Sequence, residues 1–199
     1  INNTPQNDWG YIAEHLLSIP MAHKMIGFYT VADSGDGILK VMRSYQYYAA
    51  SEIFDVVSKV EWGVKHPMGG FVWHTTGSGK TLTSFKAAQL LASSNLVDKV
   101  VFLVDRRELA TQSQEEYENF ANDDETVNQT VTSSVLFSML ANDNKSNTLI
   151  VTSIQKMSNA DENKQVATRA QVAKINHKRV AIIVDECHRD TFGKMMQII

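Results

Sequence analysis

A glycine-rich stretch in the first half of the chain has the residue types and spacing to bind phosphate. It reads His74-Thr75-Thr76-Gly77-Ser78-Gly79-Lys80-Thr81. Glycines let a backbone curl so that its N–H groups point at phosphate oxygens, and a following helix adds its positive N-terminal end. In such a loop Lys80 reaches the β- and γ-phosphates, and the Thr81 hydroxyl binds Mg²⁺. We therefore predict that residues 75–81 bind the phosphates of ATP.

One position departs from the usual form of this loop. The strict pattern has a glycine five residues before Gly79, where this chain has His74. A histidine packed at the end of a strand explains His74 without any catalytic role. A Gly/Ser turn before a helix is the alternative to a phosphate loop. The intact run from Gly77 to Thr81 favours the phosphate loop.

Two adjacent acids, Asp185 and Glu186, follow an apolar run, and the first of them lies 105 residues after Lys80. A strand over 180–184 places both acids at the carboxyl edge of a sheet, where open α/β folds bind ligands. Asp185 is suited to hold Mg²⁺ through water, and Glu186 to orient or deprotonate the attacking water. Alone, such a pair also fits an ordinary solvated loop. Together with the phosphate loop it predicts ATP hydrolysis, with Glu186, Lys80 and Asp185 as the catalytic residues.

The elements that position these residues follow from apolar periodicity. Continuous apolar runs predict strands over 71–73, 100–104, 148–152 and 180–184. Helical spacing predicts helices over 9–19, 45–60, 80–93 and 106–120. Strands that are apolar on both faces and alternate with helices are typical of a parallel sheet covered by helices on both sides. The predicted fold class is therefore α/β, with the phosphate loop between the first strand and its helix.

Composition and charge narrow the classes further. Apolar residues make up 43% of the chain and charged residues 21%, as in ordinary globular proteins. No apolar run approaches the roughly 18 residues of a membrane span, and the N-terminal residues lack the pattern of a secretion signal. With a single cysteine, Cys187, and a formal net charge of −3, we expect a cytoplasmic protein without disulfides and without DNA binding through bulk charge.

The turn-forming residues 33–37 indicate a boundary in the chain. We expect residues 1–37 to be a connector and residues 38–199 to form the nucleotide-binding domain. The initial Ile1 and the apolar end 195–199 fit either a piece of a longer protein, truncated at its C-terminus, or the loss of disordered ends.

Several strings together resemble the motor (R) subunit of type I restriction–modification enzymes, which are helicase-like translocases of superfamily 2. The phosphate loop is similar to motif I, and Asp185-Glu186-Cys187-His188 to the DEAD/DEAH-type motif II. Residues 105–109 with Gln112 resemble motif Ia, residues 152–157 the threonine-rich motif, and residues 43–46 the glutamine element that reads adenine. The resemblance covers about residues 38–199, and histidine at position 74 fits this subfamily.

The resemblance implies a RecA-like P-loop NTPase domain, the first of two in a motor that binds ATP and Mg²⁺ and pumps double-stranded DNA before cleavage. It implies that residues 1–37 are the end of a nuclease–motor linker. It also implies the partners: the rest of the R subunit with its nuclease and second RecA-like domain, and the methyltransferase and specificity subunits. We expect the nuclease signature of paired acids with Glu-x-Lys to lie outside this chain, since Glu61 has its lysine four residues on, at Lys65.

By the same resemblance Gln46 joins the loop in holding the nucleotide, and five residues contact DNA or couple it to ATP: Arg106, Arg107, Thr152, Ser153 and His188. Each also has a simpler interpretation. Gln46 fits a polar residue at a helix start, the two arginines a solvated helix face, Thr152 and Ser153 a helix cap, and His188 a satisfied histidine. The basic stretch 164–178 is an ordinary solvated helix or a DNA contact.

Two other functions remain open from the sequence. One is a P-loop nucleotidase or kinase of another class, which would lack the elements over 105–112 and 152–157. The other is a non-catalytic interaction module that keeps the fold. Intact Lys80, Thr81, Asp185 and Glu186 favour an ATPase over the second.

Overall fold

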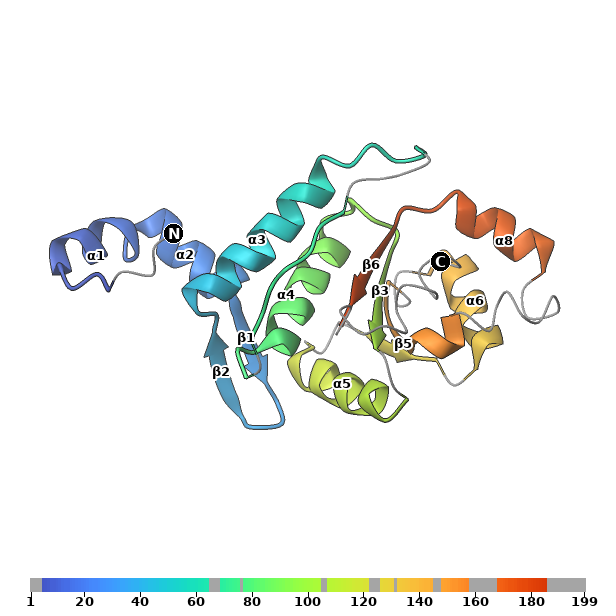
Figure 1. Cartoon of the computed structure of the whole chain (residues 1–199). Coiled ribbons are helices and arrows are strands. Elements are labelled where there is room, and N and C mark those ends of the chain that lie inside the picture. The colour runs from blue at the N-terminus through green and yellow to red at the C-terminus, as the bar shows by residue number, and fades with distance from the viewer. Residues whose placement is uncertain are drawn as a thin grey trace.

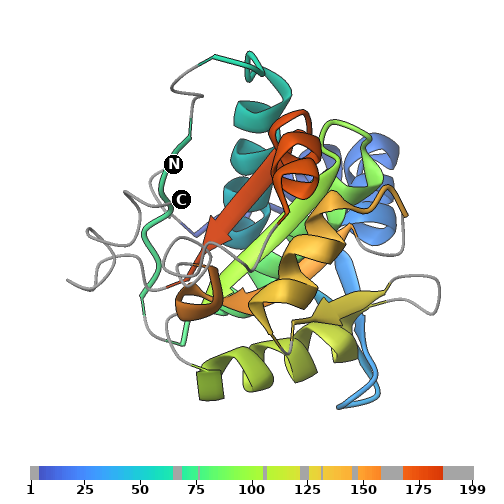
Figure 2. The same ribbon diagram turned by 90° about the vertical axis from the view of Figure 1, so that its right-hand side faces the viewer.

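The computed structural model describes residues 5–64, 69–75, 77–104, 107–121, 126–130, 132–144, 148–157 and 168–185. At 107–110, 112 and 129 it describes the backbone alone. Within these ranges the chain folds as an α/β domain around a four-stranded parallel sheet (Figures 1 and 2).

The sheet has the strand order β4-β5-β3-β6. The bounds are Lys99–Val104 for β3, Val127–Gln129 for β4, Leu149–Ser153 for β5 and Val180–Val184 for β6. All pairs are parallel, and Val101 of β3 is in register with Ile150 on one side and Ile182 on the other. Within the described residues β6 pairs only with β3, so its outer edge is unpaired. Every residue of β3 and β5 is buried, as continuous apolar runs predict.

Helices cover both faces of the sheet (Figure 2). Helices α4 (Lys80–Ser93) and α5 (Arg107–Phe120) lie on one face, where Phe85 and Tyr117 pack against Phe102 of β3. Helices α6 (Ser133–Ala141) and α8 (Arg169–Asn176) lie on the other face, against Val101 and Leu103. The alternation of β3 side chains between two apolar clusters confirms the fold class predicted from the sequence.

The N-terminal part adds helices and a hairpin beside this sheet. Helices α1 (Trp9–His15) and α2 (Ile19–Phe28) contain no buried residue, and α3 (Ser44–Ser58) packs on α4. Strands β1 (Thr30–Asp33) and β2 (Ile38–Val41) form an antiparallel hairpin. Val31 of β1 belongs to the same apolar cluster as Phe85. The boundary expected after residue 37 therefore falls inside a hairpin that packs on the domain, and the division of the chain stays a prediction.

The structure corrects two predicted elements. The strand over 71–73 is wrong: the segment has no secondary structure, and Phe71 and Trp73 are 83% and 86% exposed. An extended segment becomes a strand only by hydrogen bonding to a neighbour, and no described strand lies against it. The helix predicted over 9–19 is shorter: α1 ends at His15, and α2 begins at Ile19 with Pro20 in its first turn. No described helix has the length and apolar character needed to cross a membrane.

Candidate functional site

The loop before α4 has a backbone conformation that depends on glycine. Gly77 and Gly79 have φ angles of +74° and +79°, in the left-handed region that only glycine adopts without strain. Gly79 forms the N-cap of α4, and its carbonyl accepts hydrogen bonds from the N–H and the hydroxyl of Thr83. The first backbone N–H groups of a helix have no partner within the helix, so they are available to an anion at this end. The described part of the loop thus has the left-handed glycines typical of a phosphate loop, with the Ser78 N–H donating to the Thr75 carbonyl at 3.2 Å.

Two side chains of α3, Tyr45 and Gln46, donate hydrogen bonds to carbonyl groups of this loop. The Gln46 side chain, 5% exposed, donates from Nε2 to the carbonyls of Ser78 at 3.1 Å and Gly79 at 3.4 Å. Its Oε1 accepts from the backbone N–H of Arg43 at 2.8 Å. The Tyr45 hydroxyl donates to the Ser78 carbonyl at 2.9 Å. A Cβ atom at Gly79 would lie 2.4 Å from Gln46 Nε2, so this close approach also requires glycine.

We expect Gln46→Ala to weaken binding of ATP and GTP by similar factors. The substitution removes the amide that supports the loop, and the loop contacts only phosphates, which the two nucleotides share. Both carbonyls keep another donor, Tyr45 for Ser78 and Thr83 for Gly79, so losing this amide costs about 0.5–1.5 kcal/mol for each hydrogen bond. Calorimetric titrations with each nucleotide measure the effect. If only ATP binding weakens, Gln46 reads adenine in the bound state, as the resemblance implies.

Hydrogen bonding around His74 fixes its protonation pattern. The Ser78 hydroxyl donates its one hydrogen to the Thr75 carbonyl at 2.7 Å, so it accepts from His74 Nδ1 at 2.9 Å. The proton therefore lies on Nδ1, and Nε2 is buried with no hydrogen-bond partner in the described part of the chain. Burial, and secondarily the charge of Lys80, lowers the pKa of His74. His74 is therefore a neutral, packed side chain, and its hydrogen bond to Ser78 joins the residue before the loop to the middle of the loop.

Asp185 follows β6 at the carboxyl end of the sheet. Its backbone N–H donates to the Leu103 carbonyl at 2.9 Å, which extends the pairing of β6 with β3 by one bond. Its carboxylate is close enough to Tyr117 to add to the raised pKa of that phenol, which burial mainly causes. The Tyr117 hydroxyl donates to Ser84 Oγ, one turn after Lys80 on α4. Tyr117 thus lies between Asp185 and the N-terminal half of α4, and the shared site of Asp185 and Lys80 stays a prediction.

The oxygen atoms of Thr81 and Asp185 suit a hard cation such as Mg²⁺. Thr81 lies in the first turn of α4, and its own carbonyl accepts from Ser84 Oγ, the group that also bonds to Tyr117. In the described ranges no three His, Cys, Asp or Glu side chains gather into a metal site. Mg²⁺ commonly binds through one or two protein oxygens together with substrate phosphates and water. The donor set therefore fits Mg²⁺ that arrives with a nucleotide.

Other residues singled out from the sequence do not join this site. Thr152 and Ser153 are fully buried, and Thr152 pairs with Thr130 through their hydroxyls at 2.6 Å. Neither side chain reaches solvent, so neither contacts DNA in this structure. Of Arg107 only the backbone is described, at the start of α5. Thr76, Arg106, Glu186 and His188 lie outside the described residues, and their roles remain predictions.

Two features were not predicted from the sequence. The Tyr45 contact to the loop was missed, although an aromatic residue directly before Gln46 was visible. The chain does contain a Glu-x-Lys triplet, Glu162-Asn163-Lys164, which was overlooked when only Glu61 was considered. This triplet also lies outside the described residues. The absence of the nuclease from the chain therefore stays a prediction.

Comparison with known proteins agrees with this site. Residues 45–199 match the SWI2/SNF2 ATPase family. A type I restriction enzyme endonuclease subunit of Staphylococcus aureus is 42% identical over 88% of this chain, and the match spans 17% of that protein. The putative C-terminal part of such an endonuclease subunit from Mycoplasma pneumoniae is 39% identical over 81% of this chain and 78% of that protein. The chain therefore belongs to the SWI2/SNF2 ATPase family, in the branch formed by the endonuclease subunits of type I restriction enzymes.

Proposed function

We propose that this chain is the ATP-binding part of a motor that moves double-stranded DNA in a type I restriction enzyme, and that it is the first of two RecA-like domains. The observation that carries the proposal is the glycine-shaped loop at the start of α4 together with Asp185 at the adjoining end of the sheet. The match to the SWI2/SNF2 ATPase family supports ATP as the nucleotide that this arrangement binds.

Each residue of the site has a distinct task in this proposal. The amides of residues 77–81 and the ammonium of Lys80 bind the phosphates and neutralise charge that grows on them during transfer. Thr81 and Asp185 would hold Mg²⁺, which would supply positive charge to the phosphates. Glu186 orients the attacking water and accepts its proton. Gln46 and Tyr45 keep the loop in place.

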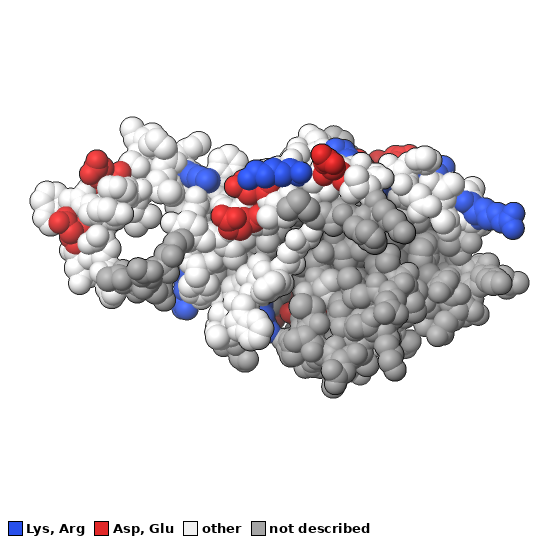
Figure 3. Space-filling model, turned by 45° about the horizontal axis from the view of Figure 1, so that its top comes forward, with Lys and Arg blue, Asp and Glu red and all other residues white. Residues whose placement is uncertain are grey.

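The partners follow from the family and are proposed with it. They are double-stranded DNA, the methyltransferase and specificity subunits, and the remaining nuclease and motor parts of the endonuclease subunit. On the face shown in Figure 3, basic and acidic side chains are interspersed rather than gathered in one basic patch. As the resemblance implies, we propose local DNA contacts at Arg106, Arg107 and His188. Because the proposed function is DNA translocation, we also propose that the protein lies in the bacterial or archaeal cytoplasm.

Lys80→Ala is expected to weaken ATP binding about 10- to 100-fold, because a charge-assisted contact contributes roughly 1.5–3 kcal/mol. Isothermal titration of the chain with ATP and Mg²⁺ measures this. Lys59→Ala, which removes an equal charge at the C-terminal end of α3, is the matched control and is expected to bind ATP normally. Equal affinity in the Lys80 variant would contradict the phosphate-binding role.

The motor itself is tested in an assembled restriction complex in which this chain is part of the endonuclease subunit. Displacement of a third DNA strand from a site far from the recognition sequence reports translocation. We expect displacement that depends on ATP and stops with Lys80→Ala but not with Lys59→Ala. DNA-independent ATP hydrolysis without displacement would favour a nucleotidase instead.

A further inference from the structure

A polar pocket lies at the opposite end of the sheet from the phosphate loop. It has a volume of about 470 Å³, and ten residues from four segments line it. Lys99 begins β3 and Arg179 directly precedes β6, so the pocket is at the amino ends of these parallel strands, whereas Asp185 follows the carboxyl end. Helix α4 joins the two regions: Lys80 is at its start, and Ala92, one residue from its end, lines the pocket.

The wall of this pocket carries more positive than negative charge. Lys99, Lys174, Lys178 and Arg179 line it, against Asp98 and Asp143. The C-terminal ends of α4 and α8 also face this region, and each contributes about half a negative charge. Together these negative charges offset about three of the four cations, so roughly one positive charge remains for a ligand to neutralise.

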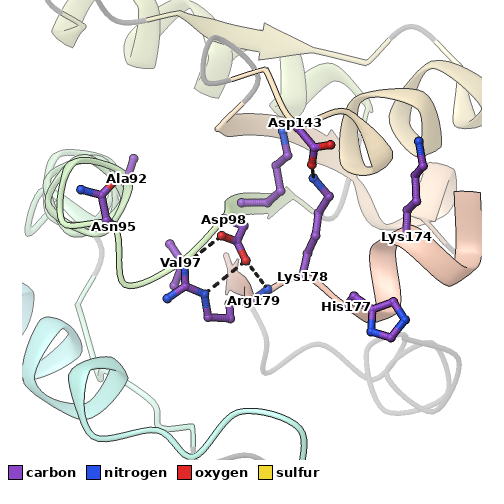
Figure 4. Close-up of a pocket in the computed structure, with 10 residues that line it drawn as sticks. Ala92, Asn95, Val97, Asp98, Asp143, Lys174, His177, Lys178 and Arg179 are labelled. Atoms are coloured by element: carbon purple, nitrogen blue, oxygen red, sulfur yellow. Dashed lines mark hydrogen bonds and ion pairs between the residues drawn. The ribbon is translucent and has the colours of Figure 1, made fainter.

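The two aspartates differ in how firmly they are held. Asp98 accepts from Arg179 at three points, from the backbone N–H at 2.8 Å, from Nε at 3.2 Å and from Nη2 at 2.9 Å, which fixes both residues (Figure 4). Asp143 instead reaches the pocket from the surface with an 87% exposed side chain. It pairs with Lys178 Nζ, which also donates to the Asn142 carbonyl at 3.1 Å. The Asp143 carboxylate thus occupies an anion position that solvent can reach.

Three of the four cations come from residues 174–179, and the fourth, Lys99, comes from the start of β3. Figure 4 shows Asn95 on one side, Lys174 and His177 on the other, and Asp98, Lys178 and Arg179 between them. Lys99 is only 1% exposed and its Nζ already donates to the Asn144 carbonyl at 3.5 Å, so an anion would add to this contact only as a small group inside the pocket. Burial, and secondarily the charge of Lys178, lowers the pKa of Lys99, so an added anion would favour its charged form. A concave site of this kind suits a compact anion better than the outer surface of a duplex.

We propose that this pocket binds a small phosphate-bearing anion, which displaces the Asp143 carboxylate from Lys178 and lies between Lys178, Lys174 and Lys99. The site is separate from the loop that binds the phosphates of ATP, and the proposal does not depend on ATP hydrolysis. Its ligand class is a diphosphate or phosphate ester of a size that the cavity admits.

The test is a calorimetric titration with pyrophosphate at fixed ionic strength, on the 199-residue chain carrying Lys80→Ala so that the phosphate loop is weakened. We expect one pyrophosphate to bind. Adding Lys178→Ala should weaken that binding about 10-fold or more, and adding Asp143→Asn should strengthen it about fivefold, because a competing carboxylate is gone. Lys59→Ala in the same background is the charge-matched control and should change nothing.

Asp143→Asn alters an exposed side chain, so its effect does not depend on whether the Lys178 variant folds. Loss of pyrophosphate binding on adding Asp143→Asn, or identical affinities in the Lys178, Asp143 and Lys59 variants, would overturn the proposal. Binding of a short DNA duplex without binding of pyrophosphate would also overturn it and would make the pocket a nucleic-acid contact. Failure of ATP to bind the chain with an intact Lys80 would contradict the proposed function alone.

Discussion

Replacing Glu186 with Gln is expected to slow ATP hydrolysis about 10²- to 10⁴-fold while leaving ATP affinity unchanged. The substitution keeps the size of the side chain, but it replaces a carboxylate oxygen with an NH₂ donor and so removes the group that orients water and accepts its proton. Glu186 directly follows Asp185, which the structure places at the carboxyl end of β6. The measurement is phosphate release by the assembled restriction complex with DNA present, beside a titration of ATP binding.

The neighbouring acid provides the matched control for this experiment. Asp185→Asn is expected to raise the Mg²⁺ concentration needed for half-maximal hydrolysis, because Asp185 is proposed to hold the ion and not to accept the proton. The two variants should therefore differ in their Mg²⁺ dependence. Normal turnover by the Glu186 variant would contradict the catalytic role assigned to this pair.

Truncating Phe85 to Ala is expected to lower the free energy of unfolding by about 3–5 kcal/mol. Phe85 is completely buried on α4, and its ring packs against Tyr117 at 5.1 Å and Phe120 at 5.5 Å between centroids. Removing the ring leaves a cavity between α4 and α5 that these aromatic neighbours fill only in part. Urea denaturation followed by circular dichroism measures the change.

The control for this loss is a phenylalanine on the surface. Phe71 is 83% exposed, so Phe71→Ala is expected to change the free energy of unfolding by no more than about 0.5 kcal/mol. A similar small effect at Phe85 would contradict the packing of α4 against α5. Because the phosphate loop leads directly into α4, the Phe85 variant should also bind ATP less tightly.

Patterns of apolar residues predicted the central part of the fold. The runs 100–104, 148–152 and 180–184 became β3, β5 and β6 within one residue at either end, because strands buried on both faces must be apolar throughout. Helix α4 begins at Lys80 as predicted, because the preceding Gly79 has a left-handed conformation that cannot continue a helix backward into the loop. Local sequence patterns were sufficient to predict these elements, because the apolar runs are buried and the glycine before α4 has the expected backbone conformation.

Predictions failed where an element depends on a partner distant in the chain. The apolar residues 71–73 resemble a strand, but no described strand pairs with them. Strand β4 was missed because Val127–Gln129 is short and mostly polar, and it forms by pairing with β5. The hairpin of β1 and β2 was read as a turn alone, since its strands have only four residues each.

The sequence predicted candidate site residues, whose roles remain predictions, and it did not predict what supports the loop. Spacing alone indicated Lys80, Thr81 and Asp185, because phosphate loops and strand-end acids have characteristic sequences. Their support by Tyr45 and Gln46 depends on how α3 packs on α4, which no local pattern specifies. Thr152 and Ser153 differ from these residues. The resemblance implied that they contact DNA or couple it to ATP, but they lie at the end of the central strand β5 and are buried.

Amide chemical shifts of the chain, recorded by NMR during titration with ATP and Mg²⁺, test most directly whether the phosphates lie on this loop. The account predicts the largest changes at the backbone N–H groups of Gly77, Ser78, Gly79 and Lys80, with smaller changes along the first turn of α4. The Lys80→Ala chain should require about 10- to 100-fold more ATP for the same changes. Shifts confined to other parts of the chain, or an unchanged spectrum at saturating ATP, would contradict the central claim.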